Sequence, residues 1–396
     1  MRFTAPIGEF QKKLQRTLPA IPTKATIEVL EHLKLELVDN TLKIIGSDQD
    51  ILIIAKMNVV TIEPGSVLVP AKKLNDIIRE FGAVGEFEFT VMPDTYNIEI
   101  KTQSGRFDMK GLDPDEYIDL PVLFEQEDLP KEELAEGVID TTLPSAKFYQ
   151  NEFNQLCNKT AVSISKNDFR LQMTGMFLQF RETYVNAVST DTYRLTKVTL
   201  ESKDSSYPQE LDIIIPHKAV DYLKKIDSEV TMSVLHRGNK YTHARFEYED
   251  IVFITNVIND KFPPYESVIP KNNHITLLID KNQMLSALKR VSLFANETTK
   301  QIKLSITRDN LNFKGTDEDT GSEAEENIKC ECNHDPFEIA FNSKYLNELI
   351  SNIDDSDTDG GIIAFTFSES DKPALIMPKL EEQNRFMMLL MPVRIS

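Results

Sequence analysis

The side chains that most resemble metal-binding or catalytic groups are carboxylates two residues apart. Asp48 and Asp50 form one such pair, Asp317 and Asp319 form another, and each follows an alternating apolar stretch. Paired carboxylates can hold the metal ions of hydrolytic sites, but Asp also closes turns at the ends of strands. The flanking pattern favours strand-end turns, and a carboxylate metal enzyme is kept as the alternative.

Two other stretches carry ligand-like residues. Asp355-Ser-Asp-Thr-Asp-Gly360 follows the first half of a calcium-binding loop, but its twelfth position is Thr366, where such loops have Glu. Cys330, Cys332 and His334 alternate on a predicted strand, so they share a face but leave a metal site one ligand short. We therefore predict no metal and no cofactor.

Enzyme motifs are missing from the sequence. It has no Walker-type phosphate loop, no Gly-x-Gly-x-x-Gly and no Gly-x-Ser-x-Gly. The six His residues show no spacing that indicates a catalytic triad. We expect a protein without catalytic activity.

Composition indicates a globular protein of several domains. The chain has 396 residues, of which 41% are hydrophobic, enough for a core and roughly two to four domains. No apolar run approaches the length of a membrane helix, and the first residues lack the apolar region of a signal peptide. Three Cys cannot build a disulfide framework. We expect a cytoplasmic protein that does not enter membranes.

The elements that would position these residues recur three times in the same order. Each repeat is predicted to have two amphipathic helices and about eight short strands. The predicted helices are 6–18, 71–81, 147–160, 216–227, 281–294 and 343–351. The predicted strands include 27–30, 169–173 and 325–332.

A strand followed directly by a helix marks the same point of each repeat. It reads Val67-Leu-Val-Pro70 in the first, Ile213-Ile-Ile-Pro216 in the second and Glu338-Ile-Ala-Phe341 in the third. The period of roughly 130 to 145 residues is far longer than that of solenoid repeats, so whole domains are duplicated. We predict an α+β fold with domains 1–122, 141–270 and 271–396, and a solvated acidic connector at 123–140.

One stretch, Ala187–Lys197, distinguishes the middle repeat. It reads as a strand that ends in a polar corner, and weaker copies occur at 44–53 and 311–320. Only the middle copy carries Tyr193-Arg194-Leu195. This divergence points to the middle repeat as the place to look for a binding site.

Charge is distributed unevenly along the chain. The net charge is −19, which opposes nucleic-acid binding at long range. Nevertheless, five of the six predicted helices have more Lys and Arg than Asp and Glu. If the helices share one side, that side is basic and would contact phosphates. Since no recognition helix or zinc finger is present, such binding would be independent of base sequence.

Several motifs occur in a specific order. They are Ser189–Leu195, Phe262–Pro270, Val291–Glu297, Thr320–Glu326 and Met391–Ile395. Together with the triplication, they resemble the bacterial DNA polymerase III beta subunits, the sliding clamps, over the whole chain. The resemblance implies a head-to-tail homodimer that forms a ring of six domains, with helices around double-stranded DNA. It also implies replicative polymerase, clamp loader and other proteins with clamp-binding motifs as partners.

The resemblance assigns residues to three surfaces. DNA-facing positions are Lys24, Lys72, Lys73, Lys166, Arg170, His217 and Lys218, to which helix periodicity alone adds Lys12, Lys13 and Arg16. Partner-peptide positions are Met173, Thr190, Thr192, Tyr193, Arg194, Leu195, Pro263, Val268, Met391, Pro392, Val393 and Arg394. Dimer positions are Phe107, Leu293 and Phe294.

Two features qualify the assignment. The family commonly has Gly-His where this chain has Thr192-Tyr193, so the peptide preference is expected to differ. A clamp-like scaffold of a plasmid or phage, which gathers partners without serving the main replicase, is the second alternative.

Overall fold

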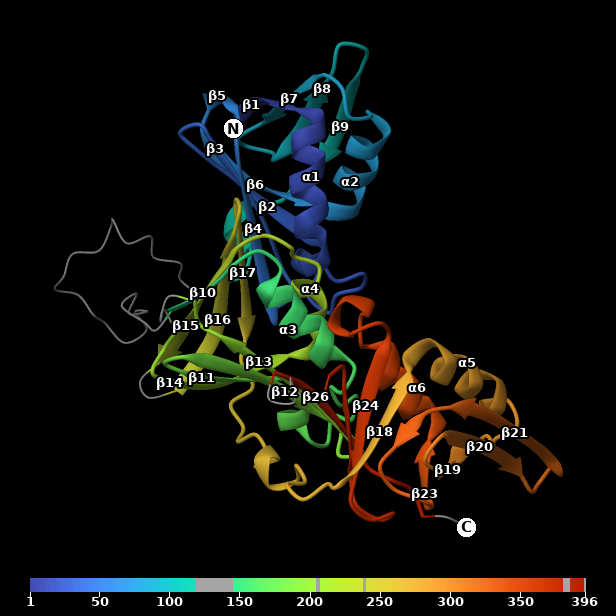
Figure 1. Ribbon diagram of the computed structural model, residues 1–396. Coiled ribbons are helices and arrows are strands. Elements are labelled where there is room, and N and C mark those ends of the chain that lie inside the picture. The colour runs from blue at the N-terminus through green and yellow to red at the C-terminus, as the bar shows by residue number, and fades with distance from the viewer. Residues whose placement is uncertain (119–144, 204–206, 238–239, 380–384, 395–396) are drawn as a thin grey trace. The chain divides into compact units, whose positions relative to one another are not determined.

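The computed structural model describes residues 1–118, 145–203, 207–237, 240–379 and 385–394 (Figure 1). The acidic connector predicted at 123–140 lies outside these ranges. In the described ranges no helix is long and apolar enough to cross a membrane. The chain divides into two compact units, residues 1–151 with 228–257, and residues 152–227 with 258–396.

The first unit contains two antiparallel sheets. The five-stranded sheet runs in the order β5 (Val60–Glu63), β1 (Arg2–Pro6), β7 (Glu86–Val91), β8 (Asn97–Lys101) and β9 (Arg106–Lys110). The eight-stranded sheet runs β10 (Ser145–Phe148), β15 (Val230–Arg237), β16 (Lys240–Tyr248), β17 (Ile251–Asn256), β4 (Ile51–Asn58), β3 (Thr41–Ser47), β2 (His32–Val38) and β6 (Gly65–Pro70). Pairing of β17 with β4 makes it continuous.

The second unit also contains two antiparallel sheets. The nine-stranded sheet runs β14 (Glu210–Pro216), β11 (Gly175–Arg181), β12 (Tyr184–Thr190), β13 (Arg194–Glu201), β26 (Phe386–Leu390), β25 (Ala374–Met377), β24 (Ile362–Phe367), β18 (Ile275–Asp280) and β22 (Glu331–Cys332). The four-stranded sheet runs β21 (Ser322–Lys329), β20 (Asn310–Asp317), β19 (Gln301–Ile306) and β23 (Phe337–Asn342). Pairing of β13 with β26 joins strands from the second and third repeats.

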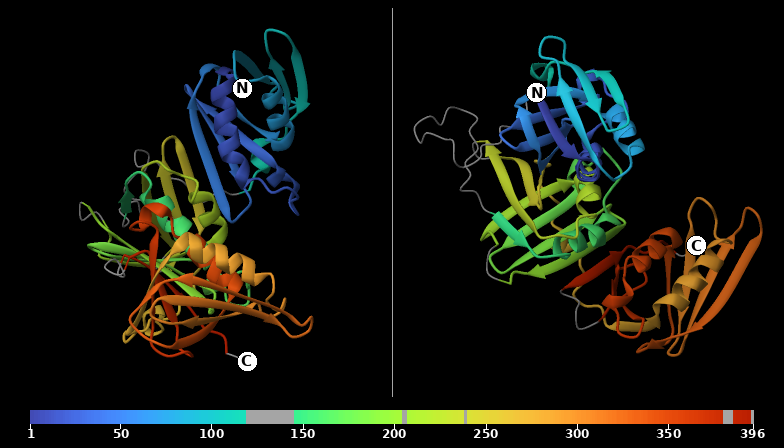
Figure 2. Two further views of the ribbon diagram at one scale, coloured as in Figure 1. Left: turned by 45° about the vertical axis from the view of Figure 1, so that its right-hand side comes forward. Right: turned by 90° about the horizontal axis from the view of Figure 1, so that it is seen from above.

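The six predicted helices are present. They are α1 (Ile7–Thr17), α2 (Ala71–Glu80), α3 (Glu152–Ala161), α4 (His217–Leu223), α5 (Lys281–Ser292) and α6 (Ser343–Ser351). The predicted strand-to-helix junctions are confirmed, because β6 leads directly into α2, β14 into α4 and β23 into α6. Asn342 caps α6, since its side-chain oxygen accepts hydrogen bonds from the amides of Lys344 and Tyr345. Figures 1 and 2 show α5 beside α6 in every orientation.

Some predicted boundaries are wrong at junctions. The predicted helix 147–160 is instead strand β10 followed by α3, which begins only at Glu152. Ala146 and Phe148 are buried at alternate positions of a strand that pairs with β15, so these residues follow a strand period and not the predicted helical period. Asn151 then adopts φ of 66°, a left-handed conformation that no helix tolerates in its interior.

Other differences concern short apolar segments. Residues 27–30 and 169–173, predicted as strands, contain the 3₁₀ turns Glu28–Glu31 and Leu171–Met173. The predicted strand 325–332 is two strands, β21 and β22, separated at Cys330. The helix predicted at 216–227 ends at Leu223. Short apolar runs give no reliable period, because a strand and a buried turn then expose similar patterns.

Candidate partner pocket and charged surfaces

The corner after β12 is built by two side chains that bond to the backbone ahead of them. Asp191 Oδ1 accepts hydrogen bonds from the amides of Tyr193 and Arg194, each at 3.0 Å. Thr190 Oγ1 accepts one from the amide of Thr192 at 3.2 Å and donates one to the Arg194 carbonyl at 2.8 Å. This arrangement turns the chain and projects Tyr193, which is 58% exposed.

Thr192 stands at the strained position of this corner. Its φ is 79°, a left-handed conformation that is unusual for any residue with a Cβ and most unfavourable for a β-branched one. Gly, which the resemblance implies at this position, would adopt the same φ without strain. The structure therefore places a conformational cost at Thr192.

The first repeat contains the same corner in full. Ser47 Oγ accepts from the Gln49 amide at 3.2 Å, and Asp48 Oδ1 accepts from the amides of Asp50 and Ile51 at 3.1 and 3.0 Å. Gln49 also has φ of 79°. The carboxylate of Asp48 thus closes a strand-end turn, as the sequence pattern favoured.

Behind the middle corner, Arg194 is the centre of a buried charge network. It is 8% exposed; its Nε lies 3.1 Å from Asp191 Oδ2 and its Nη1 lies 2.5 Å from Glu348 Oε2 of α6. Its guanidinium also lies over the Tyr345 ring, 4.7 Å from the centroid. A buried guanidinium needs such partners, because its desolvation is otherwise very unfavourable.

Tyr345 completes a stack with the exposed corner residue. Its ring lies 5.8 Å from that of Tyr193, with an angle of 24° between the planes. Partial burial, and next the charge of Asp191, raises the pKa of Tyr345, so its hydroxyl stays protonated at neutral pH. The stack joins an exposed aromatic of the second repeat to α6 of the third.

A cavity of about 710 Å³ opens beside this network. Of the predicted pocket residues, it brings together Met173, Thr192, Tyr193 and Arg194. It also contains Lys166 and Arg170, which the sequence assigned to DNA. The lining residues that sequence reasoning missed are Ala161, Val162, Ile164, Ser165, Asn167, Asp191, Lys344, Tyr345 and Glu348. Asp191 was inside the motif, but nothing local pointed to α6.

The other predicted pocket residues are not among those that line the cavity. Thr190 and Leu195 are buried, and Leu195 packs in a cluster with Phe262 and Tyr265, next to Pro263. Val268 is 51% exposed after that segment. The C-terminal segment Met391–Arg394 begins at the corner, because the Met391 amide donates to the Tyr193 carbonyl at 2.9 Å. Val393 bonds to Ala340, while Pro392 is half-buried and Arg394 is exposed.

The predicted DNA-facing residues differ in exposure and in the ion pairs that the structure shows. Lys12, Lys24, Lys72, Lys73, His217 and Lys218 are exposed, and Lys166 and Arg170 are exposed around the cavity. Lys13 instead lies 2.9 Å from Asp250, and Arg16 is paired with Glu249. Both acids belong to the turn between β16 and β17, so these two helix charges are already partly neutralised.

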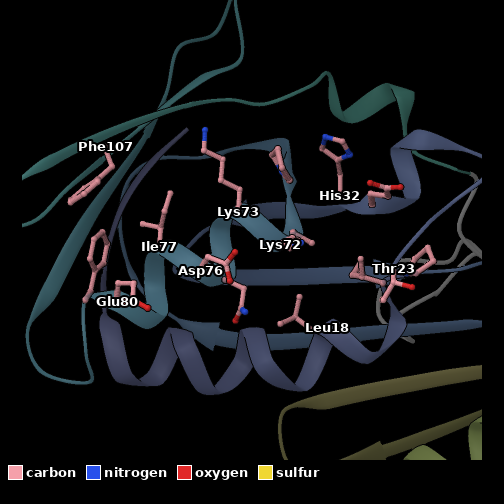
Figure 3. A pocket seen from close by; sticks show the side chains of 16 residues that line it. Leu18, Thr23, His32, Lys72, Lys73, Asp76, Ile77, Glu80 and Phe107 are labelled. Carbon is pink, nitrogen blue, oxygen red and sulfur yellow. The ribbon is translucent and has the colours of Figure 1, made fainter.

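The first unit has an apolar groove that ends at Phe107. The groove has a volume of about 940 Å³ and follows α2 from Thr23 and His32 to Phe107, with Lys72, Lys73 and Ile77 along it (Figure 3). Phe107 is 38% exposed, and its ring lies 4.9 Å from that of Phe81. In the second unit, Leu293 and Phe294 follow α5 and are 82% and 42% exposed.

Two sheet edges differ in charge. Strand β9 is an edge strand of the first unit and exposes Arg106, Asp108 and Lys110. Strand β21 is an edge strand of the second unit and carries several acids, among them Glu323 and Glu325. Unpaired edges tend to add another strand, and opposite charge favours that pairing.

The residues that resembled metal ligands in the sequence have other contacts or surroundings in the structure. Within the described ranges, no group of three or more His, Cys, Asp or Glu is arranged to hold a metal ion. In the stretch that resembled a calcium loop, Asp355 and Asp357 bind lysines. Burial, and next the neighbouring Cys332, raises the pKa of Cys330 to about 11, so its thiol stays protonated at neutral pH.

Comparisons with known proteins cover all three repeats. Family models match residues 1–121 as the N-terminal domain of the DNA polymerase III beta subunit, 147–264 as its central domain and 266–394 as its C-terminal domain. The beta sliding clamp of Staphylococcus aureus is 27% identical over 405 residues, with 100% of this chain and 99% of that protein covered. That of Pseudomonas aeruginosa is 24% identical over the full length of both chains.

Solved structures show the same fold. A sliding clamp from Pseudomonas aeruginosa bound to griselimycin matches with a TM-score of 0.86 at 23% identity, and one from Bacillus subtilis with 0.86 at 22%. Each match covers 100% of both chains. Since the family models span nearly the whole chain in domain order, the chain belongs to the DNA polymerase III beta-subunit family, the sliding clamps of bacterial DNA replication.

Proposed function

We propose that this chain is the non-catalytic processivity clamp of a bacterial replicase. Two copies close head to tail around double-stranded DNA in the cytoplasm and tether polymerase, clamp loader and other proteins through one peptide pocket. No cofactor takes part. Ring closure retains an acidic protein on DNA by topology, so the helix lysines need only accept phosphates while the ring slides.

The observation that carries the proposal is the pocket at the middle corner. Of the three repeats, the middle one turns an exposed Tyr and a buried Arg towards a cavity, and α6 supplies its other wall. Apolar and aromatic walls with a few polar groups suit short peptides with Leu or Phe anchors. Met173 and Met391 can re-pack around different anchors, which fits several partners sharing one site.

The ring would close through the apolar groove and the two edges. Leu293 and Phe294 of one copy are exposed apolar side chains of the kind that the groove at Phe107 can receive from a second copy. Pairing of β9 with the acidic β21 of the other copy would remove two unpaired edges. The same contact made twice, by a two-fold axis, gives a closed dimer.

Retention on DNA tests the proposal directly. A clamp loader is used to place the protein on nicked circular DNA, and half of the sample is then made linear by a restriction enzyme. We expect the protein to stay on circles and to leave linear DNA from its ends. Equal loss from both would contradict the clamp function. Pull-downs with polymerase and loader would separate a replicase clamp from a plasmid or phage scaffold.

The C-terminal segment provides a test of the pocket. Removal of residues 391–396 takes away the hydrogen bond from the Met391 amide to the carbonyl of Tyr193, which lines the pocket. We expect binding of a labelled peptide that ends in Leu-Phe to be lost, with the dimer mass unchanged in sedimentation. Unchanged peptide affinity would place the site elsewhere.

A further inference from the structure

A buried lysine connects the helices that carry the two walls of the pocket. Lys159, at the end of α3, is 7% exposed, and its Nζ lies 2.6 Å from both Asp354 Oδ2 and Asp357 Oδ2. It also donates to the Asn352 carbonyl at 2.9 Å and lies 5.3 Å from the centroid of the Phe386 ring. In return, the Asn352 side chain donates to the Lys159 carbonyl at 2.7 Å.

These contacts lie close in sequence to both walls. The first wall lies within residues 161–167 and begins at Ala161, the last residue of α3, two residues after Lys159. The second wall is the exposed face of α6, with Tyr345 and Glu348, and α6 ends one residue before Asn352. A helix moves as a rod over this length, roughly 10 Å from Tyr345 to Asn352 at 1.5 Å per residue. A shift at its end therefore moves Tyr345 and Glu348 relative to the first wall.

The pocket itself is held by a stack and an ion pair that depend on this spacing. The Tyr345 ring contacts both the Tyr193 ring and the Arg194 guanidinium, and Glu348 bonds to Arg194. Cation–π and ion-pair contacts weaken when groups separate by an ångström or so. Lys159, Asp354 and Asp357 themselves do not line the cavity.

We propose that Lys159, Asp354 and Asp357 form a latch that sets the distance between the two pocket walls, which makes Lys159 a positioning residue for partner peptides. This inference rests on the proposed peptide-binding function. The latch acts on partners without touching them.

The same loop offers a matched control. Lys281, the first residue of α5, is also 7% exposed and bonds to the Ile353 carbonyl at 2.9 Å and to Asp355. It holds the 352–357 loop from within the third repeat and makes no bond to α3 that the structure describes. Lys159→Met and Lys281→Met both remove a buried charge from one loop, but only the first releases the connection between the walls.

Affinity for the labelled Leu-Phe peptide and for griselimycin is measured on each full-length variant, well below its unfolding midpoint. We expect Lys159→Met to weaken peptide binding about tenfold, a typical effect of a coupling residue outside the site. Lys281→Met should stay within about twofold of the native protein, as expected for a site without shared contacts. Asp357→Asn, a milder change in case Lys159→Met folds poorly, should weaken binding by an intermediate factor.

A second readout needs no ligand. The ring resonances of Tyr345, assigned by comparison with Tyr345→Phe, report its stacking on Tyr193. We expect them to shift in Lys159→Met and not in Lys281→Met. Equal losses of affinity in both variants, or unmoved Tyr345 resonances in Lys159→Met, would overturn the latch. Failure of the native protein to bind peptide would overturn the proposed pocket function instead, while the Tyr345 signal still decides the latch.

Discussion

At the scale of single residues, Thr192 shows how the pocket depends on backbone conformation. Its left-handed φ is stabilised by the bonds that Thr190 and Asp191 make to the amides around it. Strain of this kind is found where a function requires a fixed geometry. The ring of Tyr193, the next residue, stacks on that of Tyr345.

Substitution of Thr192 by Gly should separate stability from binding. Gly relieves the strained φ, so we expect the free energy of unfolding to rise by about 1 kcal/mol, measured by urea denaturation. Peptide affinity should fall, because the corner becomes freer. Gln49→Gly is the matched control at the equivalent corner, and it should raise stability similarly while leaving affinity unchanged. A stability loss in both variants would refute the strain argument.

The cysteines allow a prediction about reactivity and pH. The pKa of Cys330 is raised to about 11 and that of Cys157 is raised further, in both cases mainly by burial. The protonated thiols are therefore favoured by folding. This contribution to the free energy of unfolding is present below pH 9, the ordinary pKa of a cysteine thiol. For Cys330 it is lost as the pH rises from about 9 through 11. We expect iodoacetamide to label half-buried Cys332 first, as mass spectrometry of digests would show; prior labelling of Cys330 would contradict its burial.

At the scale of elements, the helices present two kinds of lysine. Lys72 and Lys73 on α2 are exposed, whereas Lys13 on α1 is held by Asp250. An exposed ion pair contributes little to stability, but it neutralises charge that would otherwise meet phosphate. Helical position alone therefore does not decide which lysines contact DNA.

Replacement of these lysines by Gln should reveal the difference. For Lys72→Gln and Lys73→Gln, we expect weaker binding to a short DNA duplex. The slope of log affinity against log salt concentration should become smaller in magnitude by about one per lysine. Lys13→Gln, changed on a neighbouring helix, should lower the slope much less. Fluorescence anisotropy over a salt series measures both. A full loss of slope with Lys13→Gln would show that Asp250 releases it to DNA.

The sequence predicted elements well where one periodicity ran without interruption. The α+β class, the six helices and the strand-to-helix junctions at Pro70 and Pro216 follow from local patterns. The strand 145–148 was missed because its partner β15 lies more than eighty residues away. For the same reason, Arg194 was predicted in the pocket, but Tyr345 and Glu348 were not. Contacts between distant segments leave no trace in local spacing.

At the scale of the whole molecule, the proposed dimer contact joins two unlike surfaces of one chain. The groove at Phe107 and the exposed Leu293 and Phe294 lie in different compact units. Such unlike surfaces form either a closed dimer or an open polymer, and the rotation between copies decides which. The measured mass in solution distinguishes these outcomes.

Charge placed in this contact should open the dimer. We expect Phe107→Asp and Leu293→Asp each to convert the dimer to monomer at micromolar concentration, because a buried unpaired carboxylate is strongly unfavourable. Phe169→Asp is the control, since Phe169 is 98% exposed and lies outside the contact. Sedimentation velocity gives the masses. A dimer that survives both interface changes would place the contact elsewhere.

The corner shared by the first two repeats also has a consequence for protein engineering. Residues 47–51 reproduce the hydrogen bonds of the middle corner, including φ of 79° at its third position, while exposed Asp50 stands where the middle copy has Tyr193. Since the same bonds to the backbone build both turns, the side chain displayed at the fourth position can differ while the turn stays the same. The corner of the first repeat is therefore a scaffold onto which a second recognition loop can be grafted.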